Sequence, residues 1–137
     1  MEQITVAVIV EKGVEKVWEC WNEPEHITHW AFASEDWECP YAKNDNFTVG
    51  GTFITRMAAK DGSMSFDLEG VYTEVVPYEK IAYTMGDRAV SIVFTKVDES
   101  TTKVTESFDP ETLNPFEMQR GGWQAILNNF KKYTESV

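Results

Sequence analysis

The stretch NPFEMQRGGWQAILNNFKKY, residues 114–133, decides the fold of this chain. Asn114 is suited to cap a helix, Pro115 fits its first turn, and Glu117 completes the spacing of a capping box. The apolar residues that follow recur at helical spacing and form one stripe along a long helix. They are Phe116, Trp123, Ile126, Leu127, Phe130 and Tyr133. Such a helix needs an apolar surface to cover its stripe.

The residues before this helix predict that surface, an antiparallel sheet. From about Trp37 onward the pattern changes to strands, and turn signals separate the runs at 44–45, 50–51, 61–62 and 86–87. Asp61-Gly62 suits a tight hairpin turn with positive φ. Consecutive strands with short turns indicate a meander. The expected strands are 53–59, 65–76, 80–85, 89–97 and 103–108.

The first 31 residues predict one more strand and two short helices. Residues 4–10 are rich in β-branched types, which favours a strand. Gly13 fits a helix N-cap, and Pro24 should end the first helix and open the second. The first helix has an apolar face of Val14, Val17, Trp18 and Trp21, and the second has one of Ile27, Trp30 and Ala31.

This order of elements predicts an α+β domain over residues 1–137, in which a curved antiparallel sheet wraps around the long C-terminal helix. A large curved sheet and one helix need not fill all the space between them. We therefore expect a cavity lined by strand residues and by the helix's aromatic stripe.

Composition excludes several classes of function. The chain has 137 residues and a formal net charge of −11, which disfavours nucleic acid and anionic membranes as partners. Two cysteines make no disulfide framework, the N-terminus does not resemble a signal peptide, and the longest apolar run, 6–10, is far too short to insert into a membrane. We expect a soluble cytoplasmic protein. Since no coiled-coil heptad supports a strong dimer, we expect a monomer or a weak homodimer.

Several segments together resemble a known superfamily. They are VEKVWECWNEPEHITHW (14–30), VGGTF (49–53), DG (61–62), EGVYTEVVPYEKIAYT (69–84), TKVTESF (102–108) and GGWQAILNNF (121–130). Their order resembles the SRPBCC superfamily, the START-like helix-grip fold, and its branch named for the activator of the heat-shock-protein-90 ATPase. The resemblance covers essentially the whole chain. It implies a helix-grip fold with a deep cavity between the sheet and the C-terminal helix. Members bind lipids, sterols, hormones or polyketides, and some are cyclases, aromatases or dehydratases.

Five aromatic residues are candidates to line that cavity. They are Trp30, Tyr83, Phe94, Phe116 and Trp123. Each could instead be an ordinary core residue. An aromatic lining suits a flat or greasy ligand, and Tyr and Trp add a polar group that a pocket can use.

Glu106 is the polar candidate. By period-2 alternation it shares a strand face with Val104 and Phe108, so an inward-facing strand would place its carboxyl group in the apolar cavity. Burial would raise its pKa and let it orient a ligand or act as a general acid or base. Gln119 and Arg120 on the closing helix are possible partners. The opposite facing would leave Glu106 on the surface.

Other features have plainer interpretations. Gly121-Gly122 indicates close packing of the helix on the sheet, or else a helix thinned at the mouth of the pocket. Arg56 and Arg88 are expected in surface salt bridges, and Cys20 as a small packing residue. His26 and His29 have a spacing that can bind a metal, but no second ligand pair accompanies them, so we predict no metal site.

The sequence thus predicts binding of a small hydrophobic or aromatic molecule by Trp30, Tyr83, Phe94, Glu106, Phe116, Gln119 and Trp123. We predict no cofactor, and no motif for a nucleophile or a phosphate loop is present. Two alternatives remain open. The chain could be a protein-interaction module with a chaperone as partner, or a cyclase- or dehydratase-type enzyme that uses Glu106.

Overall fold

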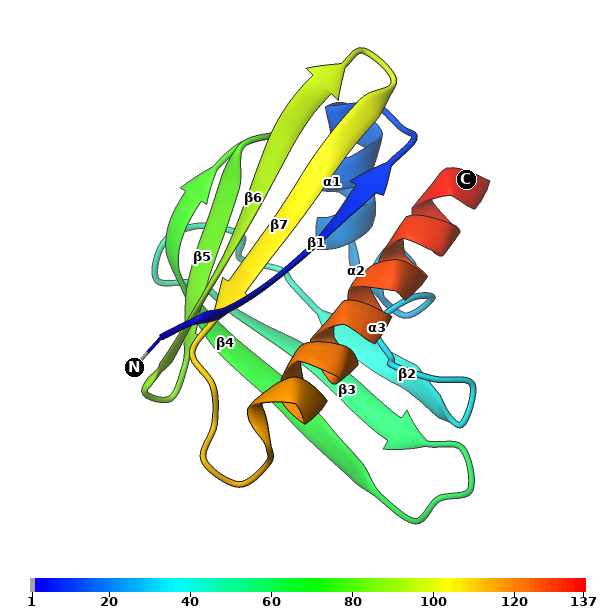
Figure 1. The fold of residues 1–137 in the computed structure, drawn as a ribbon, viewed down its shortest axis with the longest axis vertical. Helices are drawn as coiled ribbons and strands as arrows, with labels where there is room; N and C mark the ends of the chain where they lie inside the picture. Colours follow the sequence, from blue (N-terminus) through cyan, green and yellow to red (C-terminus); the bar gives the residue numbers. More distant parts are fainter. Residues whose placement is uncertain (1) are drawn as a thin grey trace.

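The computed structural model describes residues 2–137 as one seven-stranded antiparallel sheet with three helices. Figure 1 shows the strongly curved sheet with the C-terminal helix lying along it. The helices are α1 (Val14–Asn22), α2 (Pro24–Ile27) and α3 (Phe116–Ser136). The strands are β1 (Ile4–Val10), β2 (Trp37–Lys43), β3 (Thr52–Ala59), β4 (Ser65–Val76), β5 (Lys80–Met85), β6 (Arg88–Asp98) and β7 (Thr101–Phe108).

The sheet is a meander with one exception. Its strand order is β1-β7-β6-β5-β4-β3-β2, so β1 joins the far edge beside β7 and every pair is antiparallel. The register shifts in β2, β4 and β6, and such bulges increase the local twist. The twist curls the sheet into a half-barrel around α3, as the helix-grip prediction required.

Local sequence explains most of these elements. Strand β1 has the burial pattern of a half-buried strand, with Ile4, Val6, Val8 and Val10 turned to the core. Gly13 is the N-cap of α1 and Pro24 opens α2, as predicted. Gly62 has the predicted positive φ, +81°, but the loop between β3 and β4 spans residues 60–64 and is longer than the predicted tight hairpin turn.

The predicted capping box of α3 is wrong. The N-cap is Pro115, with φ −56° and ψ 145°, and no side chain caps the helix. Its backbone carbonyl still accepts the first helical hydrogen bonds, from the amides of Met118 and Gln119. Pro115 therefore starts the helix through its fixed φ rather than occupying the first turn.

The core fills only part of the space between the sheet and α3. Phe108, Phe130, Leu127, Ile4 and Ile92 have almost no exposed surface. Trp21, Trp30 and Phe130 pack together near α1 and α2, with ring centroids 4.9 Å apart in each pair. Toward β3, β4 and the N-terminal half of α3 the packing stops, and a hollow remains.

Candidate ligand cavity

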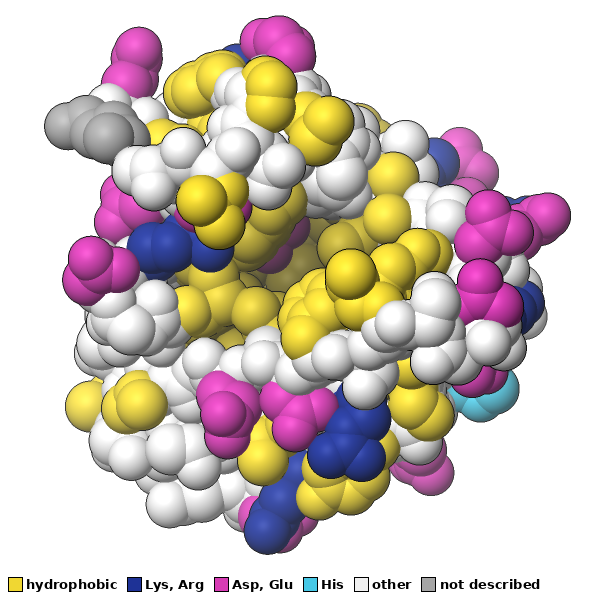
Figure 2. All heavy atoms as spheres, turned by 90° about the horizontal axis from the view of Figure 1, so that it is seen from below, with side chains coloured by type: hydrophobic (Ala, Val, Ile, Leu, Met, Phe, Trp, Pro, Cys, Tyr) yellow, Lys and Arg dark blue, Asp and Glu magenta, His cyan; other side chains and the backbone are white. Residues whose placement is uncertain are grey.

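The hollow is a cavity of about 440 Å³ between the sheet and α3. Figure 2, viewed from the lower end of Figure 1, shows its mouth and a lining made mainly of hydrophobic side chains. This volume lies within the range of sites for small molecules. The sheet contributes Trp37, Phe53, Thr55, Met57, Phe66, Leu68, Tyr72, Ile81, Tyr83, Met85, Arg88 and Glu106. The helices and loops contribute Trp21, Asn22, Ile27, Trp30, Ala31, Phe32, Ala33, Ser34, Asn44, Gly122, Trp123 and Ile126.

Trp30 forms a fixed part of the wall. Its indole Nε1–H donates a hydrogen bond of 2.9 Å to the carbonyl of Cys20, which satisfies the one polar atom of this buried side chain. The carbonyl of Phe32, two residues later, accepts a 2.9 Å hydrogen bond from the side-chain Nδ2 of Asn129 on α3. These hydrogen bonds attach the segment after α2 to α1 and α3 and so fix its position beside the cavity.

A glycine on β4 shapes the opposite wall. Phe53 packs on Tyr83 with ring centroids 4.8 Å apart and planes at 81°. Gly70 pairs with Phe53 across β3 and β4, and a side chain at this glycine would meet the Phe53 ring. The absence of a side chain at Gly70 thus lets Phe53 lie over the sheet beside Tyr83.

One set of polar groups in the wall is hydrogen-bonded within the protein. The Tyr72 hydroxyl donates to Asn44 Oδ1 at 2.6 Å, and Asn44 Nδ2 donates to the Asn22 carbonyl at 2.8 Å. Asn22 Nδ2 in turn donates to the Trp18 carbonyl at 3.0 Å. This chain ties the loop after β2 to α1, so its groups serve the fold.

Glu106 is different, because its carboxyl group has no partner. Only 6% of the residue's surface is exposed, and within residues 2–137 no hydrogen bond or ion pair to its side chain is present. Burial raises the pKa of the Glu106 carboxyl from 4.5 to about 8. At pH 7 the group is therefore mainly a neutral acid that faces the cavity. Of the two facings that the sequence left open for Glu106, the structure has the inward one.

Tyr83 and Arg88 lie near this acid. The pKa of the Tyr83 phenol is raised well above 10, first by burial and next by the charges of Glu106 and Tyr72, while Arg88 lowers it. Arg88 Nε donates a 3.1 Å hydrogen bond to the carbonyl of Asp109. The polar end of the cavity thus combines an acid, a phenol and a guanidinium.

The structure brings four of the seven predicted residues together. Trp30, Tyr83, Glu106 and Trp123 line the cavity. Phe94 lies in the core instead, with its ring centroid 5.2 Å from Trp18 and 5.9 Å from Trp21. Phe116 is 39% exposed and lies outside the cavity. Its place at the very start of α3 explains this, because the helix begins beyond the cavity wall.

Gln119 is also displaced from its predicted role. Its side-chain oxygen accepts from the Glu111 amide at 2.8 Å, and its nitrogen donates to the carbonyls of Glu111 and Asn114 at 3.1 and 2.8 Å. Gln119 therefore orders the loop before α3 and is not a partner of Glu106. Arg120, the other suggested partner, is exposed and lies 3.6 Å from Glu117.

The two glycines of α3 do not pack closely on the sheet, which corrects the preferred interpretation of that pair. A side chain at Gly121 or Gly122 would have no neighbour within 4 Å. Gly121 faces outward and Gly122 lines the cavity. The alternative, a helix thinned beside a pocket, fits Gly122.

The predictions for the two arginines have different outcomes. Arg56 forms the predicted surface salt bridge, with Nε 2.8 Å from Asp67. For Arg88 the prediction is wrong, because this half-buried side chain borders the cavity. Period-2 alternation from Tyr83 could have found Ile81 and Met85 on β5, which sequence analysis missed. The same alternation relates the other missed residues within their own strands, Phe53 and Met57 on β3 and Phe66, Leu68 and Tyr72 on β4.

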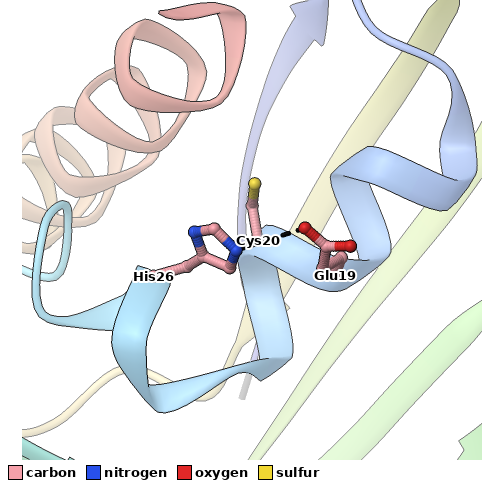
Figure 3. A group of neighbouring side chains, drawn as sticks. All are labelled: Glu19, Cys20 and His26. Atoms are coloured by element: carbon pink, nitrogen blue, oxygen red, sulfur yellow. Dashed lines mark hydrogen bonds and ion pairs between the residues drawn. The ribbon is translucent and has the colours of Figure 1, made fainter. Parts of the chain in front are cut away.

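Figure 3 shows a second group of side chains, Glu19, Cys20 and His26, where α1 meets α2. Their possible ligand atoms lie within 4.8 Å of one another. His26 Nε2 lies within hydrogen-bond distance of the Glu19 carboxylate, at 3.2 Å, and Nδ1 is hydrogen-bonded to the Tyr133 hydroxyl at 2.6 Å. Burial raises the pKa of the Cys20 thiol, as expected of a packing residue. His29 stacks on Tyr133 with ring planes at 2°. Both ring nitrogens of His26 are thus used to join α1, α2 and α3.

Comparison with known proteins gives consistent results. The family model described as "Activator of Hsp90 ATPase homolog 1-like protein" matches residues 13–135. A solution structure from Cytophaga hutchinsonii is 57% identical, with 98% of this chain and 92% of that chain covered and a TM-score of 0.82. An AHSA1-like protein from Aeromonas hydrophila is 39% identical, with 97% and 93% covered and a TM-score of 0.86. The comparison with curated proteins gave no match. Within residues 2–137, no helix combines the length and apolarity needed to cross a membrane.

Proposed function

Because the chain belongs to the family of Activator of Hsp90 ATPase homolog 1-like proteins, whose fold commonly binds hydrophobic ligands, we propose that it binds a small hydrophobic or aromatic molecule in the cavity between the sheet and α3. The observation that carries the proposal is the cavity of about 440 Å³, with walls mainly of apolar and aromatic side chains.

The energetics support such a role. A ligand that buries about 200 Å² of apolar surface gains about 5 kcal/mol at roughly 25 cal/mol per Å². Association entropy offsets part of this gain. The wall is held before a ligand arrives, by the hydrogen bonds of Trp30 and Tyr72, so little further ordering opposes binding.

Gly122 provides the test. A leucine at this position has open space around its Cβ and would extend into the cavity. We expect Gly122→Leu to weaken binding of the uncharged fluorescent probe N-phenyl-1-naphthylamine by about tenfold or more, which corresponds to about 1.4 kcal/mol. Gly121→Leu is the matched control, because it makes the same change one residue earlier on the outward face.

The measurement is a fluorescence titration of the probe with each protein. Weaker binding in Gly122→Leu alone supports the cavity as the binding site. Equal affinities in the wild type and both variants would place the probe elsewhere, and no binding to the wild type would contradict the proposal.

The family description supports a second candidate, action on an Hsp90-type chaperone. The net charge of −11 would favour a basic surface on that partner. In this case adding the purified protein should raise the ATPase rate of an Hsp90, and the increase should fall as salt is added. An unchanged rate at low salt would count against this candidate.

A further inference from the structure

We propose that the ligand of this cavity is an apolar molecule with a carboxylate at one end, and that Arg88, Tyr83 and Glu106 hold this group. This inference rests on the proposed function and specifies its ligand class. The three side chains line one cavity from β6, β5 and β7, three neighbouring strands.

Arg88 supplies the positive charge. It is the one Lys, Arg or His among the residues of the cavity lining. Its Nε donates to the Asp109 carbonyl, while its terminal nitrogens make no hydrogen bond within residues 2–137. A guanidinium with free N–H groups is well suited to bind a carboxylate.

Tyr83 and Glu106 supply neutral donors. Both side chains are buried, and within residues 2–137 neither the hydroxyl of Tyr83 nor the carboxyl of Glu106 makes a hydrogen bond. Their oxygen atoms are accessible from the cavity, because Thr134 Oγ1 is the only fully enclosed side-chain nitrogen or oxygen without a partner among residues 2–137. Two donors that open onto one cavity and have no protein partner are available to a ligand. As a neutral acid, Glu106 can donate its proton to a ligand oxygen.

Burial is the only cause of the raised pKa of Glu106, and no neighbouring charged group contributes to it. Its sheet neighbours are Val6 on β1 and Ile92 on β6, and Trp123 lines the cavity from α3. The titratable and charged groups that face this end of the cavity are Tyr83 and Tyr72, both with raised pKa values, and Arg88. Because their pKa values are raised, neither tyrosine changes its charge between pH 7 and 9.5.

Other ligand classes fit less well. A ligand without a polar end would place apolar atoms against the Tyr83 hydroxyl, the Glu106 carboxyl and the terminal nitrogens of Arg88, which is unfavourable. A ligand with an ammonium group would lie beside the Arg88 guanidinium and would need Glu106 to ionise. A neutral ketone would accept from Tyr83 and Glu106 but would gain less from Arg88 than an anion does.

The first experiment is calorimetry with four probes that share one ring system: 2-naphthoate, 2-acetylnaphthalene, 2-methylnaphthalene and 2-naphthylmethylamine. At pH 7 we expect 2-naphthoate to bind about tenfold or more tighter than 2-methylnaphthalene. We expect the ketone to lie between them and the amine to bind most weakly. Equal affinities would overturn the inference but leave the proposed function standing. Preference for the ketone or the amine would overturn the carboxylate assignment, and binding of none would contradict both proposals.

The second experiment removes each donor in turn. Arg88→Met should abolish the preference for 2-naphthoate over the ketone, while Arg120→Met, an exposed arginine on α3, should preserve it. Tyr83→Phe should weaken both oxygen-bearing probes and leave 2-methylnaphthalene unchanged. Retained preference in Arg88→Met, with a cooperative thermal unfolding transition, would exclude Arg88 from the site.

The pH profile supplies a readout that a structural role would not change. The naphthoate stays ionised from pH 7 to 9.5, so its affinity should fall about tenfold per pH unit above pH 8 as Glu106 loses its proton. Glu106→Gln keeps an N–H donor and should flatten this profile. A profile unchanged by Glu106→Gln would remove Glu106 from the proposed site.

Discussion

The indole ring of Trp123 on α3 lies nearly parallel to the ring of Phe108 on β7, with centroids 3.8 Å apart and planes at 12°. Phe108 is fully buried and stands two residues after Glu106 on the same face of the strand. The stacked pair therefore attaches the helix to the sheet directly beside the acid. It makes Trp123 both part of the cavity wall and part of the contact that sets the distance between helix and sheet.

Trp123→Ala should lower stability and binding together. Removal of a large, partly buried ring leaves a void, and we expect the free energy of unfolding to fall by about 2–4 kcal/mol. Urea denaturation measures this change, and probe titration should show a loss of binding. Met118→Ala is the control, because Met118 lies on the same helix and is 62% exposed. Equal effects of the two substitutions would contradict a special role for the stacked pair.

Glu106→Gln should gain stability relative to the wild type as the pH rises from 5 to 8. In the folded state the pKa of Glu106 is about 8, and in the unfolded chain it returns to about 4.5. Between these values the folded state holds a proton that the unfolded chain has lost, so this group lowers stability by about 1.4 kcal/mol per pH unit as the pH rises. The stabilisation that the protonated Glu106 gives the folded state is complete below pH 4.5 and is lost above pH 8.

The measurement compares urea denaturation of the wild type and Glu106→Gln at several pH values from 5 to 9. The difference between the two proteins isolates Glu106 from all other titrating groups. We expect the variant to gain on the wild type with each step up to pH 8. A constant difference across this range would show that Glu106 titrates at its ordinary pKa.

Gly121→Ala and Gly122→Ala should each stabilise the protein by about 0.5–1 kcal/mol. Alanine is the better helix former, and the structure leaves open space at both positions. Gly70→Ala should instead destabilise it, because the new methyl group would collide with the Phe53 ring. Thermal or urea unfolding of the three variants tests the contrast, and destabilisation by both helix substitutions would mean that α3 packs more closely than the structure shows.

Tyr133→Phe should weaken the junction of the three helices. It removes the hydroxyl that is hydrogen-bonded to His26 Nδ1 at 2.6 Å, and the loss of one such bond costs about 1 kcal/mol. Tyr41→Phe is the matched control, because Tyr41 is exposed on β2. Chemical denaturation should separate the two variants, and identical stabilities would show that the bond to His26 contributes nothing.

The periodicity of apolar residues and the turn residues between them made most of the fold predictable. The strands predicted at 65–76 and 80–85 coincide with β4 and β5, because turn residues mark their ends and alternation fills their length. Alternation also placed Glu106 on one strand face with Val104 and Phe108, although it left open whether that face points inward. These features depend on residues that are close in sequence, so they can be predicted from a single sequence.

The wrong predictions concern features that depend on how the helices and strands are placed relative to one another. Nothing in the sequence shows that α3 begins beyond the cavity, which leaves Phe116 outside, or that Gln119 turns back to the loop at Glu111. Arg88 resembled a surface residue because it follows a turn, yet the curl of the sheet brings it to the cavity. The open space at Gly122 likewise depends on the spacing of helix and sheet, which local pattern does not specify.

The bonds between α3 and β1 also bear on how separate molecules of this protein meet. Strand β1 is an edge of the sheet, with one side of its backbone unpaired by any other strand. Gln124 Nε2 donates to the Ala7 carbonyl at 3.1 Å, and Lys131 Nζ donates to the Ile9 carbonyl at 2.6 Å. An unprotected edge is a template on which another chain can add a strand. By occupying these carbonyls, the helix that closes the cavity also guards the sheet against aggregation through this edge.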